Sequence, residues 1–217
     1  MEATTTGRSI AQYAEAKDRL HPAGSMVVLD RLIDQEIPRL QRGQYLLVHL
    51  LLPHYPYIFD QTCALRPVAE WRNRAVPLGE VDTTATRTER YRLYADQIAC
   101  TRRKLDLLLA SVAQNPALAD ATILIHGDHG SRIAIEKWQS AGAGYDEGAY
   151  LRDLHLTHFA VRLPGRSGRR IEPPLAIHDV FAALVDARFA DIDLSEVSAG
   201  RPLAARLFGS SEAGVKP

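Results

Sequence analysis

Residues 121–132 read ATILIHGDHGSR, and this stretch decides the fold that the sequence predicts. Its first half, ATILIH, is an apolar run that stops where the glycine follows. A second apolar run, YLLVHLLL, occupies residues 45–52. Continuous rather than alternating hydrophobicity is typical of a strand that is buried on both faces, as in a parallel sheet. We therefore expect both runs to be interior strands of one sheet.

The rest of the chain alternates helical and strand patterns around these two runs. Apolar residues at helical spacing predict three helices, over 26–40, 87–115 and 179–188. A third strand is expected over 157–163. Ser25 is the expected N-cap of the first helix, and Asn115 followed by proline ends the second. The proline-rich segment 53–86 is expected to be a loop. This order predicts an α/β fold with a mostly parallel sheet flanked by helices.

The helical patterns also predict which side chains face the core. In the second helix the expected inward stripe is Tyr91, Tyr94, Ile98 and Leu105, and in the last helix it is Val180, Phe181, Leu184 and Val185. Cys63 is interpreted as structural or incidental, and Cys100, in the middle of the second helix, as packed. Two cysteines are too few for a disulfide scaffold, although one bridge between them remains open.

Composition limits the class of protein. The chain has 217 residues, of which 46% are apolar and 24% charged, as expected for one large globular domain or two small ones. Its 26 basic residues balance its 26 acidic ones, which argues against a nucleic-acid partner. No apolar run approaches the length of a membrane span, and the first residues lack the pattern of a signal peptide. The sequence therefore predicts a soluble chain without a signal peptide or transmembrane segment.

The loop GDHGSR is the sharpest candidate for chemistry. Asp128 and His129 lie side by side directly after a predicted strand, where ligands bind in open α/β sheets. A carboxylate and an imidazole at such a position can share one divalent cation, and the flanking glycines allow close approach. The alternative interpretation is a turn whose polar side chains cap the next element. Both interpretations stay open from the residues alone.

A second candidate follows the other apolar run, in the segment PHYPYIFD at residues 53–60. His54 is held between two prolines, which restrict the backbone and suit a group that must meet a substrate in one orientation. Its imidazole could act as an acid or donate to an oxyanion. The alternative is an aromatic-proline turn that packs against the edge of the sheet.

Four segments in this order resemble the sulfatase family of the alkaline phosphatase superfamily. They are HLLLPHYPYIFD at 49–60, YADQIACTRRKLDLLLA at 94–110, ATILIHGDHGSR at 121–132 and HFAVRLPGR at 158–166. The resemblance spans about residues 26–185 and is nearest to the bacterial membrane-associated sulfatase-like group. It implies an alkaline-phosphatase-like α/β domain over residues 25–198, with an N-terminal extension at 1–24 and a C-terminal tail at 199–217.

The resemblance also implies roles for individual residues. Asp128 and His129 correspond to the family's downstream pair of metal ligands, for calcium, zinc, manganese or magnesium. His54 corresponds to the substrate-contacting histidine, and His158 lies where a further substrate-facing group could sit. The family's nucleophile and first acidic ligands precede the histidine-proline segment, and no Cys/Ser-x-Pro-x-Arg signature stands there. The catalytic nucleophile is therefore unassigned, and the chain resembles a domain that lacks its N-terminal part.

Three functions follow from this resemblance. The first is a metal-dependent hydrolase of sulfate or phosphate esters, incomplete or split, with an anionic ester as substrate. The second is a non-catalytic binding module whose exposed sheet edge is covered by a partner chain or a second copy. The third is part of a phosphoglycerol- or phosphoethanolamine-type transferase, which shares the site and passes the group to an alcohol.

Overall fold

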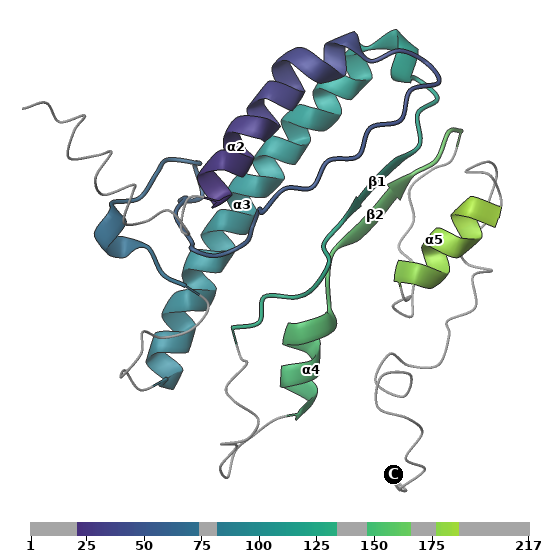
Figure 1. Ribbon diagram of the computed structural model, residues 1–217. Helices are drawn as coiled ribbons and strands as arrows, with labels where there is room; N and C mark the ends of the chain where they lie inside the picture. The colour runs from purple at the N-terminus through teal and green to yellow at the C-terminus, as the bar shows by residue number, and fades with distance from the viewer. Residues whose placement is uncertain (1–20, 74–81, 134–146, 166–176, 187–217) are drawn as a thin grey trace, which may run out of the picture. The chain divides into compact units, whose positions relative to one another are not determined.

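The computed structural model describes residues 21–73, 82–133, 147–165 and 177–186 (Figure 1). The chain divides into two units, of which the first comprises residues 1–119 and 129–155 and the second residues 120–128 and 156–217. Most of the expected N-terminal extension and all of the expected C-terminal tail lie outside the described residues.

Helices dominate the first unit. Those in the described ranges are α2 (His21–Arg31), the π-helical turn η2 (Leu32–Glu36), the 3₁₀ turns η3 (Ile37–Arg39), η4 (Val68–Glu70) and η5 (Pro116–Leu118), and the helices α3 (Thr84–Gln114) and α4 (Glu147–His155). Within the described ranges, no helix combines the length and the apolar character that crossing a bilayer needs.

The first helical stretch begins earlier than its sequence pattern indicates. α2 starts at His21, so Ser25 lies inside the helix and is not its N-cap, as we had expected. The Ser25 hydroxyl instead accepts a hydrogen bond from the Leu51 backbone N–H, at 2.8 Å. Pro38 lies in the first turn of η3, where a missing N–H is tolerated, and the helical stretch ends at Arg39, within one residue of the expected end at residue 40.

The long helix α3 is defined at both ends by its own side chains. Thr83 is the N-cap, and it forms a reciprocal capping box with Thr86. At the other end, Asn115 is the C-cap, so the predicted stop is confirmed. The Asn115 side-chain amide also donates to the backbone oxygens of Ile37 and Leu40, at 2.8 and 3.0 Å.

α3 also joins the first helical stretch along its length. The Lys104 ammonium lies 2.5 Å from the Asp30 carboxylate, and the Ser111 hydroxyl donates to the Ile33 oxygen at 2.9 Å. Figure 1 shows the two helical stretches side by side. The contacts of Lys104, Ser111 and Asn115 therefore fix residues 30–40 against the second half of α3.

The core of the first unit lies where α2, α3 and the segment after residue 53 meet. One cluster of buried side chains contains Met26, Ile58, Phe59, Trp71 and Cys100. A second contains Tyr57, Leu93 and Ile133. The buried residues of α3 are Arg90, Leu93, Gln97, Cys100 and Val112. Tyr91 and Ile98, which we expected to face inward, are 38% and 40% exposed.

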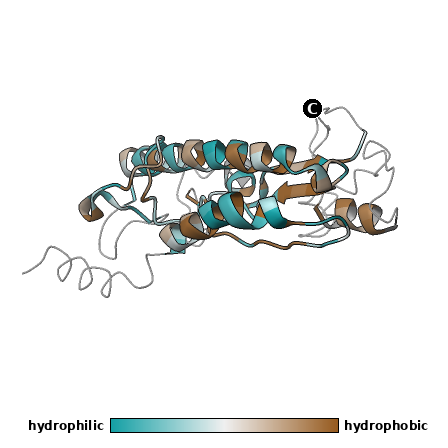
Figure 2. Ribbon diagram, turned by 90° about the horizontal axis from the view of Figure 1, so that it is seen from above, coloured by the Kyte–Doolittle hydropathy of each residue, from teal (hydrophilic) through white to brown (hydrophobic). Residues whose placement is uncertain are grey.

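In the described part of the second unit, two strands pair antiparallel beside helix α5 (Ile177–Asp186). Strand β1 (Ile123–His126) pairs antiparallel with β2 (Phe159–Arg162), with Leu124 opposite Val161. Helix α5 buries Val180 and Leu184 in a cluster with Leu163. Figure 2 shows α5 and the strands as largely apolar. Val180 and Leu184 confirm the predicted inward face, whereas Val185 is 57% exposed.

The expected mostly parallel, alkaline-phosphatase-like sheet is wrong for the described part of the chain. The one sheet there has two strands and is antiparallel. Residues 45–52, the other expected interior strand, are extended but pair with no strand in the described ranges. A continuous apolar run indicates that a segment tends to be buried. It does not specify which strand the segment pairs with, or whether the pairing is parallel or antiparallel. The sequence pattern therefore located β1 and β2 and misjudged the sheet.

Candidate functional site

α3 fixes the backbone around His54. The buried Gln97 side chain donates from Nε2 to the His54 oxygen at 2.7 Å. Its Oε1 accepts from the N–H groups of Ile58 and Phe59, at 2.8 and 3.2 Å. One side chain thus holds both ends of the segment 54–59.

The His54 ring is oriented by its neighbour. It stacks on the Tyr55 ring with 4.0 Å between centroids, and its Nδ1 lies 2.5 Å from the Tyr55 oxygen. Because a carbonyl oxygen only accepts, Nδ1 carries the proton of the neutral ring and Nε2 carries the lone pair. The peptide bonds preceding Pro53 and Pro56 are both cis. The half-buried His54 ring thus contacts both the ring and the backbone oxygen of Tyr55.

A disulfide ties the following residues to the same helix. Cys63 and Cys100 are bonded, across a sequence separation of 37. Cys63 adopts a φ of +69°, and the turn before it is closed by Asp60, whose Oδ1 accepts from the Thr62 hydroxyl and from the N–H groups of Thr62 and Ala64. These bonds, first that of the Thr62 hydroxyl, lower the pKa of Asp60. Cys63 and Cys100 thus form the one bridge that the sequence alone had left open.

The loop that contains His129 is held by α4. The N–H of Gly130 donates to the Leu154 oxygen at 2.9 Å, and that of Arg132 to the Asp153 oxygen at 3.2 Å. The Ser131 hydroxyl donates to the Asp153 carboxylate. The residue with left-handed backbone in this loop is Arg132, at φ +57°, and neither glycine. The loop 129–132 is therefore fixed by a helix that lies beyond it in sequence.

One ring nitrogen of His129 is held within its own loop. Its Nδ1 lies 2.7 Å from the Gly130 oxygen, and because a carbonyl oxygen only accepts, Nδ1 is the donor of this bond. Metal-binding histidines are commonly oriented by such a bond from the other ring nitrogen. The preceding residue, Asp128, is exposed. The pair has suitable donor chemistry for a divalent cation.

The number of donors does not complete a metal site. Zinc is normally held by three or four protein ligands, and Asp128 and His129 supply two. The described residues contain no group of three His, Cys, Asp or Glu side chains that could hold a metal ion. The residues therefore fit part of a ligand set and fall short of a full one.

His158 lies directly before β2. Its backbone oxygen accepts from the Gly127 N–H at 3.0 Å, which extends the β1–β2 ladder by one bond. The residue is exposed. Its substrate-facing role stays a prediction, as do the roles of His54, Asp128 and His129.

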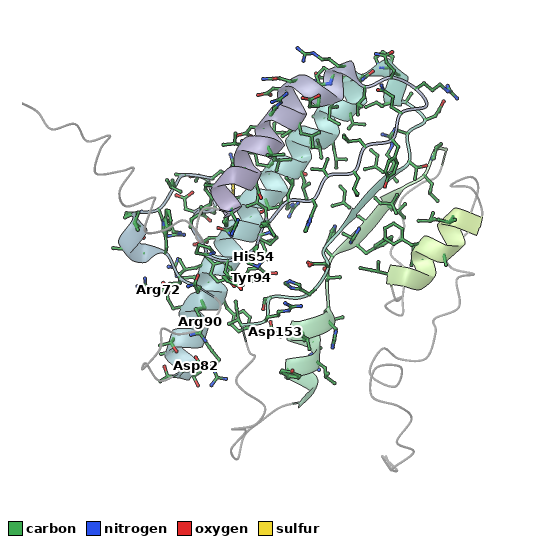
Figure 3. All side chains as sticks on the ribbon, viewed as in Figure 1. His54, Arg72, Asp82, Arg90, Tyr94 and Asp153 are labelled. Carbon is green, nitrogen blue, oxygen red and sulfur yellow. A yellow bond between two sulfur atoms is a disulfide. The ribbon has the colours of Figure 1, made fainter. Side chains whose placement is uncertain are left out.

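Sequence reasoning missed a buried polar cluster beside the His54 segment. Tyr57 is 1% exposed and its ring lies 5.6 Å from that of Tyr94. Burial raises the pKa of Tyr57 above its ordinary value, the nearby Tyr94 and Asp153 raise it further, and Arg90 opposes them. Burial, and then Asp153, raises the pKa of Tyr94 as well. Figure 3 shows Arg90, Tyr94 and Asp153 gathered near His54.

Arg90 is the most unusual member of this cluster. It is 3% exposed, and its Nη2 donates to the Asp82 carboxylate at 2.6 Å. Its Nε and Nη1 are buried without a hydrogen-bond acceptor in the described part of the chain. One signal in the sequence could have pointed to this cluster. Arg90, Tyr94 and Gln97 are spaced four and three residues apart, so they lie on the same face of the helix.

No protein-family model, no curated protein and no solved structure matches this chain.

Proposed function

We propose that the chain takes part in the metal-dependent hydrolysis of sulfate or phosphate esters. Asp128 and His129 supply two of the ligands of a divalent cation, and His54 contacts the anionic group of the ester. His158 is a further substrate-facing residue. The nucleophile and the remaining ligands lie outside the residues assigned here.

The observation that carries this proposal is the orientation of His129. Its Nδ1–H is held by the Gly130 oxygen, and the loop behind it is clamped to α4 by Ser131 and Asp153. An imidazole fixed in this way presents Nε2 as an acceptor, next to a carboxylate that can share the same cation. His54 has the same arrangement, with Nδ1 directed to its neighbour's oxygen.

Metal titration of the isolated chain tests the proposal. We expect Zn²⁺ or Mn²⁺ to bind weakly and below one ion per chain, because two ligands are too few for a closed site. Asp128→Ala and His129→Ala should each weaken binding by about tenfold or more. Asp34→Ala and His21→Ala, which change exposed residues of the same types, should bind like the wild type. Equal affinity in all five proteins would contradict the site.

Ester hydrolysis supplies the second measurement. Generic aryl sulfates and aryl phosphates should be cleaved slowly by the isolated chain, and His54→Ala should raise KM because His54 is assigned to the anionic group. Metal binding with no cleavage of any ester, under all conditions tried, would favour the second candidate below.

The second candidate is a non-catalytic binding module with an apolar interaction surface. The observation that favours it is the exposure of residues 45–48, where Tyr45 is 85% and Leu47 77% exposed. Large apolar side chains exposed together mark interaction sites. A partner chain or a second copy would cover this surface.

A further inference from the structure

Arg90 is buried on α3 with part of its guanidinium unused. The side chain is 3% exposed, and its Nη2 donates to the Asp82 carboxylate at 2.6 Å. Its Nε and Nη1 are buried and meet no acceptor among the described residues. Burying a donor of a charged group without an acceptor is costly, so such donors normally meet an ordered water or a bound ion. The guanidinium of Arg90 is therefore a place where we expect an acceptor that the described residues do not supply.

Asp82 is already shared among several donors. Its Oδ1 accepts from Arg90 and from the Thr86 hydroxyl, the latter at 3.1 Å. Its Oδ2 lies 3.4 Å from Arg87 Nε. One carboxylate thus serves three side chains at the start of α3. The remaining nitrogens of Arg90 need oxygens from another group.

A second guanidinium with an open donor borders the same cluster. The Nε of Arg132 is buried without a hydrogen-bond partner in the described ranges, and so is Nε2 of His155 on α4. Arg132 precedes Ile133, which packs against Tyr57 and Leu93 in the core of the first unit. It also adopts a φ of +57°, a strained backbone of the kind that binding sites often contain. Arg90 and Arg132 therefore bring two cations with unused donors to the cluster around Tyr57.

Tyr57 lies within electrostatic reach of both α3 and α4. Burial raises its pKa, Tyr94 and Asp153 raise it further, and Arg90 lowers it, so charges on the two helices act on one phenol. Burial raises the pKa of Tyr94 as well. Both phenols therefore keep their protons at neutral pH and can donate to an anion. Figure 3 shows Arg90, Tyr94 and Asp153 close together.

We propose that Arg90 and Arg132 bind one sulfate or phosphate ion beside Tyr57. A guanidinium forms charge-assisted hydrogen bonds with an oxyanion, and these are stronger than its bonds to water. A tetrahedral ion has four oxygens, so it can accept from donors on α3, on the loop 129–132 and on the segment 54–59 at once. Sulfate and phosphate are also the ions that the proposed ester hydrolysis releases. The anion site needs neither metal nor catalysis, so it goes beyond that proposed function.

Anion titration is the first test. Isothermal titration calorimetry in EDTA, which keeps divalent metal away from Asp128 and His129, should show sulfate or phosphate binding at one ion per chain. Sodium acetate at the same ionic strength should not saturate, because a planar carboxylate has only two oxygens. The absence of saturable binding by both tetrahedral ions overturns the proposal, and so does equally tight binding of acetate.

Substitutions test which residues hold the ion. Arg90→Met and Arg132→Met should each raise the dissociation constant by about tenfold or more, because each removes charge-assisted hydrogen bonds. The control Arg103→Met removes an exposed arginine of the same helix and should bind like the wild type. Circular dichroism checks that each variant is folded. Equal affinity in Arg90→Met and Arg103→Met overturns the site.

Nuclear magnetic resonance gives a measurement on the unmodified chain. Added sulfate or phosphate should shift two arginine Nε–H signals with the same dissociation constant. They are assigned as the signals that disappear in Arg90→Lys and Arg132→Lys. If neither signal moves, ordered water supplies the acceptors and the proposal is wrong.

One further variant separates this inference from the proposed metal site. Asp128→Ala in EDTA should bind the anion like the wild type, even if metal titration shows that Asp128 and His129 hold no cation. Loss of anion binding in Asp128→Ala would place the ion at those residues and overturn the assignment to Arg90 and Arg132.

Discussion

The Gln97 side chain on α3 donates to the backbone oxygen of His54 at 2.7 Å and joins the middle of the longest helix to the candidate substrate-binding histidine. The same side chain accepts from two further backbone N–H groups, those of Ile58 and Phe59. The conformation of the segment 54–59 therefore depends on one amide that is fully buried.

Replacing this amide should destabilise the first unit strongly. Gln97→Leu leaves the buried N–H groups of Ile58 and Phe59 without an acceptor, at about 1–3 kcal/mol each. We expect the free energy of unfolding, measured with urea, to fall by about 2–5 kcal/mol. Gln114→Leu, at the exposed end of the same helix, should change it by less than about 0.5 kcal/mol. Similar losses in both variants would contradict the role of Gln97.

The disulfide should contribute a comparable amount to the free energy of unfolding. Cross-linking residues 37 apart in sequence removes chain entropy from the unfolded state worth about 4 kcal/mol in the loop-closure model. The double variant Cys63→Ala/Cys100→Ala should therefore unfold at a markedly lower urea concentration. Dithiothreitol should lower the midpoint of the wild type and leave that of the double variant unchanged. A reductant effect on the double variant would show that the agent acts elsewhere.

The buried ion pair should respond unequally to loss of its two partners. Asp82→Asn leaves the guanidinium of Arg90 buried without a carboxylate, which costs about 3–5 kcal/mol of unfolding free energy. Arg90→Met removes the buried charge and should cost less, since an apolar side chain of similar length replaces it. The control Glu36→Gln breaks the exposed pair with Arg31 and should cost at most about 1 kcal/mol. A larger loss in Arg90→Met than in Asp82→Asn would contradict this ordering.

Tyr57 should make the protein sensitive to alkali. Its pKa is raised in the folded chain above the ordinary value of 10.0, so the unfolded chain releases this proton first as pH rises. The stabilising contribution is complete below pH 10 and is lost as pH increases above it, by up to about 1.4 kcal/mol per pH unit. Tyr57→Phe should therefore show a shallower loss of unfolding free energy above pH 10. Tyr45→Phe, which removes an exposed phenol, should retain the wild-type slope.

Local signals in the sequence identified several of the described elements and missed α4 (Glu147–His155). The Asn115–Pro116 pair gave the end of α3, and the apolar runs near residues 123 and 159 gave β1 and β2. The sheet class could not be predicted, because the apolar run 45–52 is compatible with a buried strand and also with the segment that the structure shows, which is exposed at residues 45–49 and pairs with no strand in the described ranges. Apolarity alone does not distinguish these states.

The face of α3 was misjudged for a related reason. An apolar stripe was expected to contain Tyr91 and Ile98, whereas the buried positions include Arg90 and Gln97. Polar side chains are buried only where partners satisfy them, and here the partners are Asp82 and the backbone of residues 54–59. Contacts 39 and 43 residues apart in sequence, from Gln97 to Ile58 and His54, leave no local pattern to recognise.

The candidate site shows the same division. The prolines around His54 predicted a restricted backbone. The predicted strand before Asp128 and His129 is confirmed as β1. The clamp on the His129 loop was not visible, because Asp153 and Leu154 belong to a helix more than twenty residues away, as the Ser131–Asp153 separation of 22 shows.

The contacts between α3 and residues 30–40 have a consequence for synthesis on the ribosome. Asp30 and Ile33 meet Lys104 and Ser111, which follow them by 74 and 78 residues. At typical rates of translation, roughly 4 to 15 seconds pass between the emergence of the two sides of this contact. During that interval the apolar residues 45–52 leave the exit tunnel before Asn115 exists to hold Leu40, which precedes them. The nascent chain therefore exposes this apolar segment before Cys100 is synthesised and the core cluster with Met26 and Ile58 can form.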